Sequence, residues 1–212
     1  MSKHVVLDLE MCRVPRGAKR ENFQAPRELI QIGAVLLDEQ YKVVDNFMTF
    51  VKPQYGWVDD YIRQLTGIQP SQLVSAPSTE QALKMFVEWM PQDAVLVTWS
   101  DSDVYQIDDE MYFKDIEMPA LIEYLDDFID CQQIFSEKMN ADKIYKLSEA
   151  LALTGTDCTK GEHDALEDAQ NTAALFAKLQ CEEFFTLNQY YMTQDAMTAC
   201  VFDPFKAARV AI

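Results

Sequence analysis

Residues 4–10, HVVLDLE, decide the fold of this chain of 212 residues. The run is apolar and rich in β-branched residues apart from its acids, and this composition predicts a buried strand. Asp8 and Glu10 stand two positions apart, so both side chains project from one face of that strand. Two carboxylates ~4 Å apart cost about 4 kcal/mol at an effective dielectric of about 20, unless a cation is bound between them. Taken alone, the pair also fits a strand with one wet face.

The rest of the chain predicts an α/β fold. Strands are expected over 28–38 and 41–51, joined by a hairpin at Glu39 and Gln40. Further strands are expected at 94–98 and 127–131, and helices near 59–65, 78–90, 102–113, after Pro119, at 146–153 and at 164–179. A three-stranded meander followed by alternating helices and strands predicts a mixed five-stranded sheet with helices on both faces.

The length and the 49% hydrophobic content suffice for one sizeable core. We expect one domain over residues 1–180 and a C-terminal helical extension over 181–212 that packs on the domain. The aromatic positions of this extension also leave open a dimer contact or a surface on which bases stack. The sequence does not decide between a monomer and a homodimer.

The formal net charge of −17 is unusual for a protein that binds nucleic acid. It argues against wrapping a long duplex, which needs many Lys and Arg contacts to phosphates, but not against holding a few nucleotides at a strand end. Residues 101–130 carry eleven acids against one base, Lys114. A second possibility is therefore a non-enzymatic protein that uses this acidic segment to bind a basic partner.

The five cysteines are an odd number without metal-binding spacing, which predicts free thiols rather than a zinc site or a disulfide framework. The N-terminus runs directly into a strand, and no apolar run reaches membrane-spanning length. We expect a cytoplasmic protein with no membrane contact.

Three further residues are candidates for chemistry. Asp103 begins the helix expected at 102–113, with Ile107 one turn further on the same face, whereas Asp101 is expected to cap that helix. His163 precedes the last helix, and Asp168 lies inside it among alanines and leucines. A histidine before a helix is commonly an ordinary surface residue, so His163 alone is also ambiguous.

The order and spacing of these residues resemble the DEDDh 3′→5′ exonucleases, the DnaQ-like branch of the ribonuclease H-like fold. The similarity runs from about residue 4 to 179, through DLE, Asp103 and HDALEDAQNTAALF. The linking segments LIQIGAVLLDEQYKVVDNFMTFVKP and LTGIQPSQL are similar to the Eri-type and KapD-type subgroup. The opening DLEM is also similar to that of the oligoribonucleases.

This resemblance implies phosphodiester hydrolysis with two divalent ions, Mg²⁺ or Mn²⁺. Asp8, Glu10 and Asp168 would hold one ion, and Asp8 and Asp103 the other. His163 would act as general base on a water molecule, and the product would be a nucleoside 5′-monophosphate.

The expected partner is the 3′ end of single-stranded RNA or DNA. Leu9 and Met11 adjoin the acids and are candidate substrate contacts, unless they belong to the core on the opposite sheet face. Arg13 and Arg16 belong to a basic loop and are candidate phosphate contacts, unless that loop is simply solvated. Two other functions stay open: oligoribonuclease-like degradation of very short RNAs, and a module that binds nucleic acid without cutting it.

Overall fold

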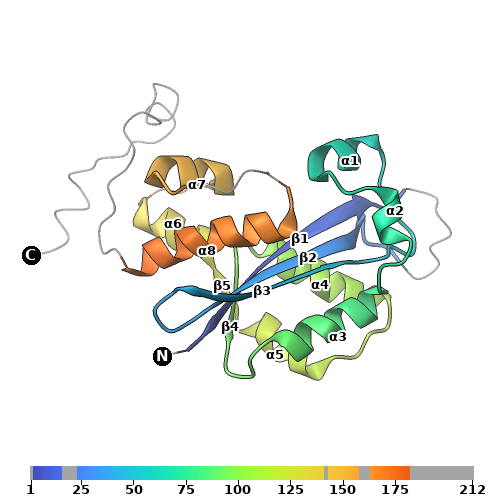
Figure 1. Cartoon of the computed structure of the whole chain (residues 1–212), viewed down its shortest axis with the longest axis horizontal. Coiled ribbons are helices and arrows are strands. Elements are labelled where there is room, and N and C mark those ends of the chain that lie inside the picture. The colour runs from blue at the N-terminus through green and yellow to red at the C-terminus, as the bar shows by residue number, and fades with distance from the viewer. Residues whose placement is uncertain (1, 16–22, 141–142, 158–162, 182–212) are drawn as a thin grey trace, which may run out of the picture.

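A mixed five-stranded sheet with the order β3-β2-β1-β4-β5 lies at the centre of the computed structural model (Figure 1). The structure describes residues 2–15, 23–140, 143–157 and 163–181. The strands are β1 (His4–Arg13), β2 (Arg27–Leu37), β3 (Val43–Phe50), β4 (Val95–Thr98) and β5 (Ile129–Asp130). The first three strands form an antiparallel meander, while β4 is parallel to both β1 and β5. The sheet confirms the predicted fold class.

Helices cover both faces of this sheet. They are α1 (Asp60–Thr66), α2 (Pro70–Leu73), α3 (Thr79–Trp89), α4 (Ser102–Phe113), α5 (Pro119–Asp126), α6 (Cys131–Lys138), α7 (Leu147–Thr154) and α8 (Ala165–Cys181). Figure 1 shows α3, α4 and α5 on one face and α6, α7 and α8 on the other, with α1 and α2 near the far end of β1.

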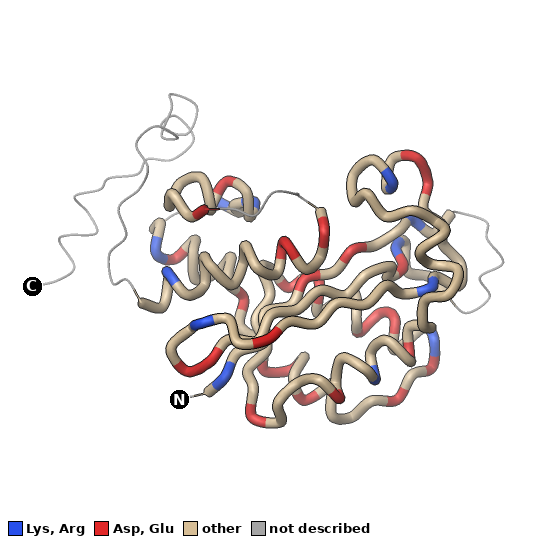
Figure 2. Tube along the Cα trace, viewed as in Figure 1, with Lys and Arg blue, Asp and Glu red and all other residues tan. Residues whose placement is uncertain are grey.

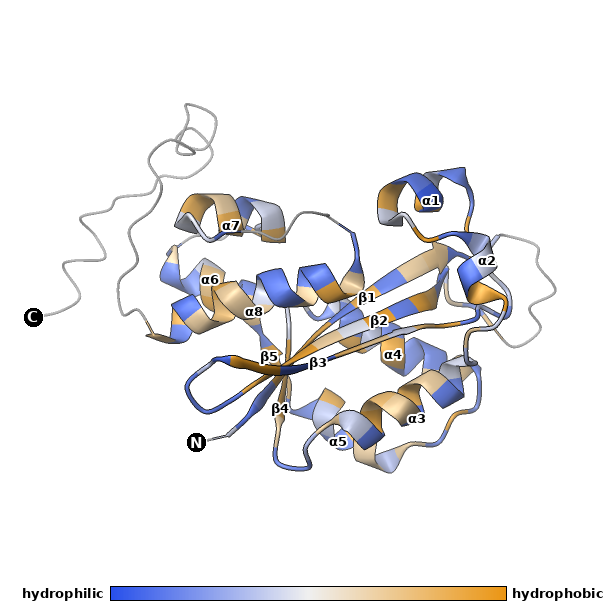
Figure 3. Ribbon diagram, in the orientation of Figure 1, coloured by the Kyte–Doolittle hydropathy of each residue, from blue (hydrophilic) through white to orange (hydrophobic). Residues whose placement is uncertain are grey.

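The alternation of side chains along β1 divides the core between the two faces. Val5, Leu7 and Leu9 pack with α3, α4 and α5, whereas Val6 packs with residues of α6, α7 and α8. Figure 3 shows the strands of the sheet as mainly hydrophobic and the turns around it as hydrophilic. Each fully buried aliphatic side chain contributes about 1.5–3 kcal/mol. Apolar packing on both faces therefore holds β1 in the middle of the molecule. This packing does not explain why the strand carries two acids.

The predicted ends of two helices are confirmed by their caps. Asp59 accepts a hydrogen bond from the backbone N–H of Ile62 at the start of α1 (2.9 Å), and Gly67 ends that helix in the left-handed region with φ 72°. Gly155 ends α7 in the same way, with φ 61°. A glycine takes this conformation without steric cost, which explains why both helices end there.

Two details of the prediction were wrong. The β2–β3 hairpin turns over residues 38–42 rather than over two residues, because the carboxylate of Asp38 accepts hydrogen bonds from the backbone N–H groups of Gln40 and Lys42. The predicted strand 127–131 is reduced to two residues, and Asp130 there caps α6 through the backbone N–H of Gln133. Helices α2 and α6 were not predicted. Most of the extension 181–212 lies outside the described residues, so its packing stays a prediction.

A buried ion-pair network joins β2, α3 and α4. Lys114 contacts Glu28 at 2.6 Å and Glu110 at 2.5 Å, with both carboxylates fully buried. Glu28 also accepts hydrogen bonds from three successive backbone N–H groups, those of residues 54–56. Lys114, the single base of the acidic segment 101–130, thus forms its ion pairs in the interior, where it offsets two buried negative charges.

Candidate active site

β1 carries two of the candidate carboxylates past the end of its parallel neighbour. β4 pairs with β1 only as far as Leu7, opposite Thr98, so Asp8 and Glu10 are flanked by a strand on one side only, by β2. Asp8 is partly buried and Glu10 is 8% exposed. The carboxyl end of parallel strands is where α/β proteins commonly bind ligands, and here it leaves space beside the two acids.

The start of α4 brings Asp103 to the same place. Its side chain is 7% exposed, and its carboxylate accepts a hydrogen bond from the backbone N–H of Leu9, the residue between the two strand acids. Asp101 takes the N-cap position of α4 but makes no capping hydrogen bond with its side chain. The inward orientation predicted for Asp103 is therefore observed, and the capping role predicted for Asp101 is wrong.

The segment that leads into α8 supplies His163 and Asp168. The backbone N–H of His163 donates to Asp168 Oδ2 at 3.0 Å, which holds the histidine in the left-handed region with φ 71°. This conformation is uncommon for a residue other than glycine, and residues held in sparsely populated backbone regions cluster at active sites. Ligand atoms of Glu10, His163 and Asp168 lie within 4.8 Å of one another.

Gly33 allows α8 to approach the sheet this closely. It is paired with Asp8 across the β1–β2 ladder, and a Cβ atom there would lie 2.2 Å from the backbone carbon of Ala165. Such a distance is far inside van der Waals contact, so every other residue would push the start of α8 away from β2. The absence of one side chain thus sets how near Asp168 lies to the acids of β1.

The acids raise one another's proton affinity. Burial, and after it the carboxylates of Asp168 and Asp103, together raise the pKa of Glu10 to about 8. Burial, together with Asp103 and Asp168, raises the pKa of Asp8 well above its ordinary range. Burial raises the pKa of Asp103 as well, and the opposing effect of the Arg27 guanidinium leaves it at about 7. Near neutral pH this cluster therefore binds either protons or cations.

The donor set fits a hard divalent cation. Carboxylate oxygens are the ligands that Mg²⁺ and Mn²⁺ prefer, and a neighbouring imidazole is compatible with Mn²⁺. Within the described residues, Glu10, His163 and Asp168 are the group of acids and histidines that could hold a metal ion, and Asp8 and Asp103 interact electrostatically with Glu10. All five residues singled out from the sequence are thus brought together.

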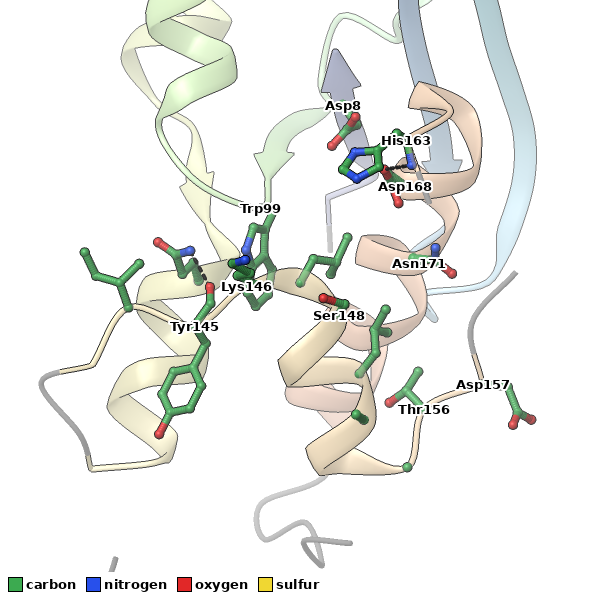
Figure 4. A pocket seen from close by; sticks show the side chains of 16 residues that line it. Asp8, Trp99, Tyr145, Lys146, Ser148, Thr156, Asp157, His163, Asp168 and Asn171 are labelled. Atoms are coloured by element: carbon green, nitrogen blue, oxygen red, sulfur yellow. Dashed lines mark hydrogen bonds between the residues drawn. The ribbon is translucent and has the colours of Figure 1, made fainter. Parts of the chain in front are cut away.

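A cavity of about 820 Å³ opens beside these residues. Figure 4 shows the imidazole of His163 next to the carboxylates of Asp8 and Asp168 at one end of it, and Trp99 and Lys146 further along. The remaining wall comes from Gln132 of α6, from residues between 144 and 157, which include α7, and from Asn171 of α8. The volume is within the range of pockets that hold small ligands, about 300–1,000 Å³.

The predicted substrate contacts lie in different surroundings. Leu9 is 4% exposed and belongs to the core on the face opposite to the acids, and Met11 packs against that core. Arg13 is exposed, with its guanidinium carbon 4.8 Å above the ring centre of Tyr61, and Trp57 forms a backbone bridge to it. Arg16 lies outside the described residues. Trp57 and Tyr61, both more than half exposed, were missed, although a tryptophan directly after Gly56 in a polar loop was a signal.

A comparison with family models matches residues 5–176 to the family described as exonuclease. The chain belongs to this family. The PolC-type DNA polymerase III of Caldanaerobacter subterraneus is 32% identical over 152 residues, 72% of this chain and 10% of that polymerase. The DNA polymerase III subunit epsilon of Aquifex aeolicus is 29% identical over 170 residues, covering 77% of this chain and 78% of the subunit.

Two further similarities support the assignment. ERI1 exoribonuclease 2 of Danio rerio is 29% identical over 187 residues, which cover 77% of this chain and 33% of that protein. The solved nuclease domain of 3′hExo, a DEDDh family member bound to rAMP, has a TM-score of 0.72 at 21% identity, covering 88% of this chain and 96% of that chain. The resemblance to DEDDh exonucleases and the ribonuclease H-like fold are thereby confirmed. This chain spans only a small part of the PolC-type polymerase and of the exoribonuclease.

The remaining predictions have mixed outcomes. Cys12, Cys131 and Cys181 are free thiols, and the other two cysteines lie outside the described residues. Among the helices described, none has the length and apolar character to cross a membrane. Figure 2 shows acidic positions on every layer of the molecule, so the acidic segment 101–130 is not the only source of negative charge. The cytoplasmic location stays a prediction.

Proposed function

We propose that the chain is a metal-dependent 3′→5′ exonuclease that removes nucleoside 5′-monophosphates from single-stranded RNA or DNA. The observation that carries this proposal is the convergence of Asp8, Glu10, Asp103, His163 and Asp168 from β1, α4 and the start of α8. These elements are far apart in the sequence. Apolar residues at these five positions would stabilise a hydrophobic core better than four acids and a histidine. The family membership supports the same reaction.

Each side chain has a distinct task in this reaction. Asp8, Glu10 and Asp168 would hold one divalent ion, and Asp8 and Asp103 a second. When bound, the two ions would neutralise the acids and stabilise charge on the phosphate and on the leaving oxygen. His163 lines the cavity beside Asp8 and Asp168, where its imidazole can accept the proton of an attacking water. The new P–O bond forms to that water while the bond to the 3′ oxygen of the preceding nucleotide breaks.

The exposed residues at the end of β1 favour a single strand as substrate. Arg13, Trp57 and Tyr61 combine a cation with two aromatic rings, which suits phosphate contact and base stacking without sequence preference. Arg13 stands three residues beyond Glu10 on the same strand, about 10 Å at 3.3 Å per residue. This surface would contact nucleotides beyond the reacting phosphate.

Digestion of a 5′-labelled single-stranded RNA and its DNA equivalent tests the proposal. Reactions with Mn²⁺, with Mg²⁺ and with a chelator are compared for the wild type, Asp8→Asn, Asp103→Asn and Asp108→Asn. Asp108 is an exposed acid on the same helix as Asp103 and is the matched control. We expect a metal-dependent ladder from the 3′ end that both site variants abolish and Asp108→Asn retains.

Other outcomes identify the rival functions. Intact strands in every lane, with folded protein that still binds the strand, would indicate a module that does not cut and would refute the proposal. A rate that rises steadily as the substrate shortens to a dinucleotide would indicate oligoribonuclease-like degradation. A ladder of equal intensity from Asp8→Asn would show that the reaction occurs elsewhere.

A further inference from the structure

Gln31 is a buried amide in the middle of β2, flanked on both sides by apolar residues. It belongs to β2, is fully buried, and is paired with Glu10 across the β1–β2 ladder. Its neighbours Ile30 and Ile32 are fully buried as well. A buried amide costs stability unless its donors and acceptor are all satisfied, so the partners of Gln31 reveal what the residue holds together.

Both ends of this amide bind the start of α8. Gln31 Nε2 donates to Asp164 Oδ2 at 2.9 Å, and Gln31 Oε1 accepts from the backbone N–H of Ala165 at 3.2 Å. The other oxygen of Asp164 accepts from the backbone N–H groups of Leu166 and Glu167, at 3.0 and 3.2 Å. Asp164 therefore caps α8 with one oxygen and joins it to β2 with the other.

Two points of attachment fix both the position and the rotation of the helix. Successive residues of an α-helix are rotated by about 100° about its axis. A shift of α8 by one residue would therefore turn Asp168 away from the face that meets β1. His163 immediately precedes Asp164, and Asp168 follows it by one turn, with its carboxylate accepting the backbone N–H of His163. Gly33 lies two residues beyond Gln31 on the same face of β2 and lets the helix backbone touch the strand. The contact thus sets His163, just before α8, and Asp168, within it, against the two acids of β1.

We propose that Gln31 is a positioning residue that, through its paired contact with Asp164, aligns His163 and Asp168 with Asp8 and Glu10. For its effect on catalysis, this inference rests on the proposed exonuclease function. Gln31 acts behind the site residues, because its amide nitrogen donates to Asp164 and its amide oxygen accepts from Ala165. Asp164 is likewise committed to the helix and to Gln31, although its charge adds to that of the site acids.

The chemistry of the pair allows it to be exchanged. Gln31→Glu would place two carboxylates in contact, and Asp164→Asn would set two amides against each other so that one N–H faces another donor. In the double variant the carboxylate introduced at position 31 can accept from the amide introduced at position 164 and from the backbone N–H of Ala165. The amide oxygen at position 164 still caps α8. Every hydrogen bond of the pair is restored, and the net charge is that of the wild type.

A cycle of the wild type, Gln31→Glu, Asp164→Asn and the double variant tests this inference. Gln40→Glu, which adds the same charge in the exposed β2–β3 turn, is the control. Three quantities are measured. They are the thermal midpoint, the Mn²⁺ affinity from the paramagnetic resonance signal of free Mn²⁺, and kcat at a saturating concentration of single-stranded nucleic acid. Substitutions behind metal ligands typically cost 10–100-fold in affinity or activity, and we expect losses of about that size from each single variant. The double variant should return to within about 3-fold of the wild type.

Two results would overturn the inference. One is that both single variants, measured at temperatures well below their thermal midpoints, keep the Mn²⁺ affinity and the kcat of the wild type. The contact between Gln31 and Asp164 would then contribute only to stability. The other is that the fold losses of Mn²⁺ affinity and kcat in the double variant equal the product of the losses in the two single variants. A wild type that binds Mn²⁺ but cuts no strand would instead refute the proposed function, and the Mn²⁺ affinities would still test the pair. A wild type that binds no Mn²⁺ would refute both.

Discussion

Glu10→Gln should stabilise the metal-free protein at alkaline pH while abolishing its response to divalent ions. The pKa of Glu10 is raised from an ordinary value of 4.5 to about 8 by burial and by neighbouring carboxylates. Between these values the folded protein retains a proton that the unfolded chain releases, so folding stability falls as the pH rises. The stabilising contribution is complete below about pH 4.5 and is lost once the pH passes about 8.

The size of this effect follows from the difference between the two pKa values. At about 1.4 kcal/mol per pH unit, the interval from 4.5 to about 8 corresponds to at most about 5 kcal/mol. Relaxation of the site and entry of water reduce this value, and we expect about 2 kcal/mol. For a chain of this size that is a shift of about 4–8 °C in the thermal midpoint. Glutamine keeps the shape of the protonated acid at every pH and should gain this amount at high pH.

Thermal unfolding in a chelator, at about pH 5, 7 and 9, measures the effect directly. The wild type and Glu10→Gln should have similar midpoints at the lowest pH and should diverge as the pH rises. Mn²⁺ should raise the wild-type midpoint most at the highest pH, because the ion then competes with few protons. Glu39→Gln, an exposed acid in the β2–β3 turn, is the control and should follow the wild type. Parallel pH profiles for Glu10→Gln and the wild type would refute the reasoning.

Three other substitutions probe the frame around the site. Gly33→Ala forces the start of α8 away from β2, and denaturant unfolding should show a loss of about 1–3 kcal/mol together with reduced hydrolysis. Lys114→Met leaves two buried carboxylates without their cation and should cost about 3–5 kcal/mol in the same assay, and a smaller loss would mean that water reaches the network. Trp57→Ala should raise KM for long single strands about 5-fold or more at unchanged thermal midpoint, since stacking on a base is worth about 1–3 kcal/mol. Tyr112→Ala, the most exposed aromatic of α4 at 78%, is its control.

The fold could be predicted because local patterns and global packing agree. The strand at the N-terminus, the meander and the long helices are marked by apolar periodicity, and the short helices α1 and α7 by caps at Asp59, Gly67 and Gly155. Two short helices were missed since a four-residue helix and a helix with few apolar positions leave little periodicity to detect. The length of the hairpin depended on Asp38 binding two backbone N–H groups, which the sequence alone does not distinguish from a shorter turn.

The residues of the candidate site could be predicted from the sequence, but the residues that position them could not. An acid in a buried strand or at the inner face of a helix stands out because burial penalises it, and this singled out Asp8 and Asp103. Gln31 and Asp164 gave no such signal: each is ordinary in composition, and the contact joins residues 133 positions apart. Gly33 could equally have marked a strand irregularity. What sequence reasoning lacked was the register of β2 against β1, which places Gly33 and Gln31 opposite Asp8 and Glu10.

The acidity of the chain and its proposed substrate are compatible because the charges act at different ranges. A formal charge of −17 repels a strand over the distance set by screening, about 8 Å at physiological ionic strength. Within that distance the local charges decide, and at the end of β1 the strand would meet Arg13 beside two exposed aromatic rings. The acids of the site are the opposite case, since a phosphate can approach Asp8 and Glu10 only when their charge is offset by cations or protons. A site built this way makes the approach of a phosphate depend on the cations or protons that offset these acids.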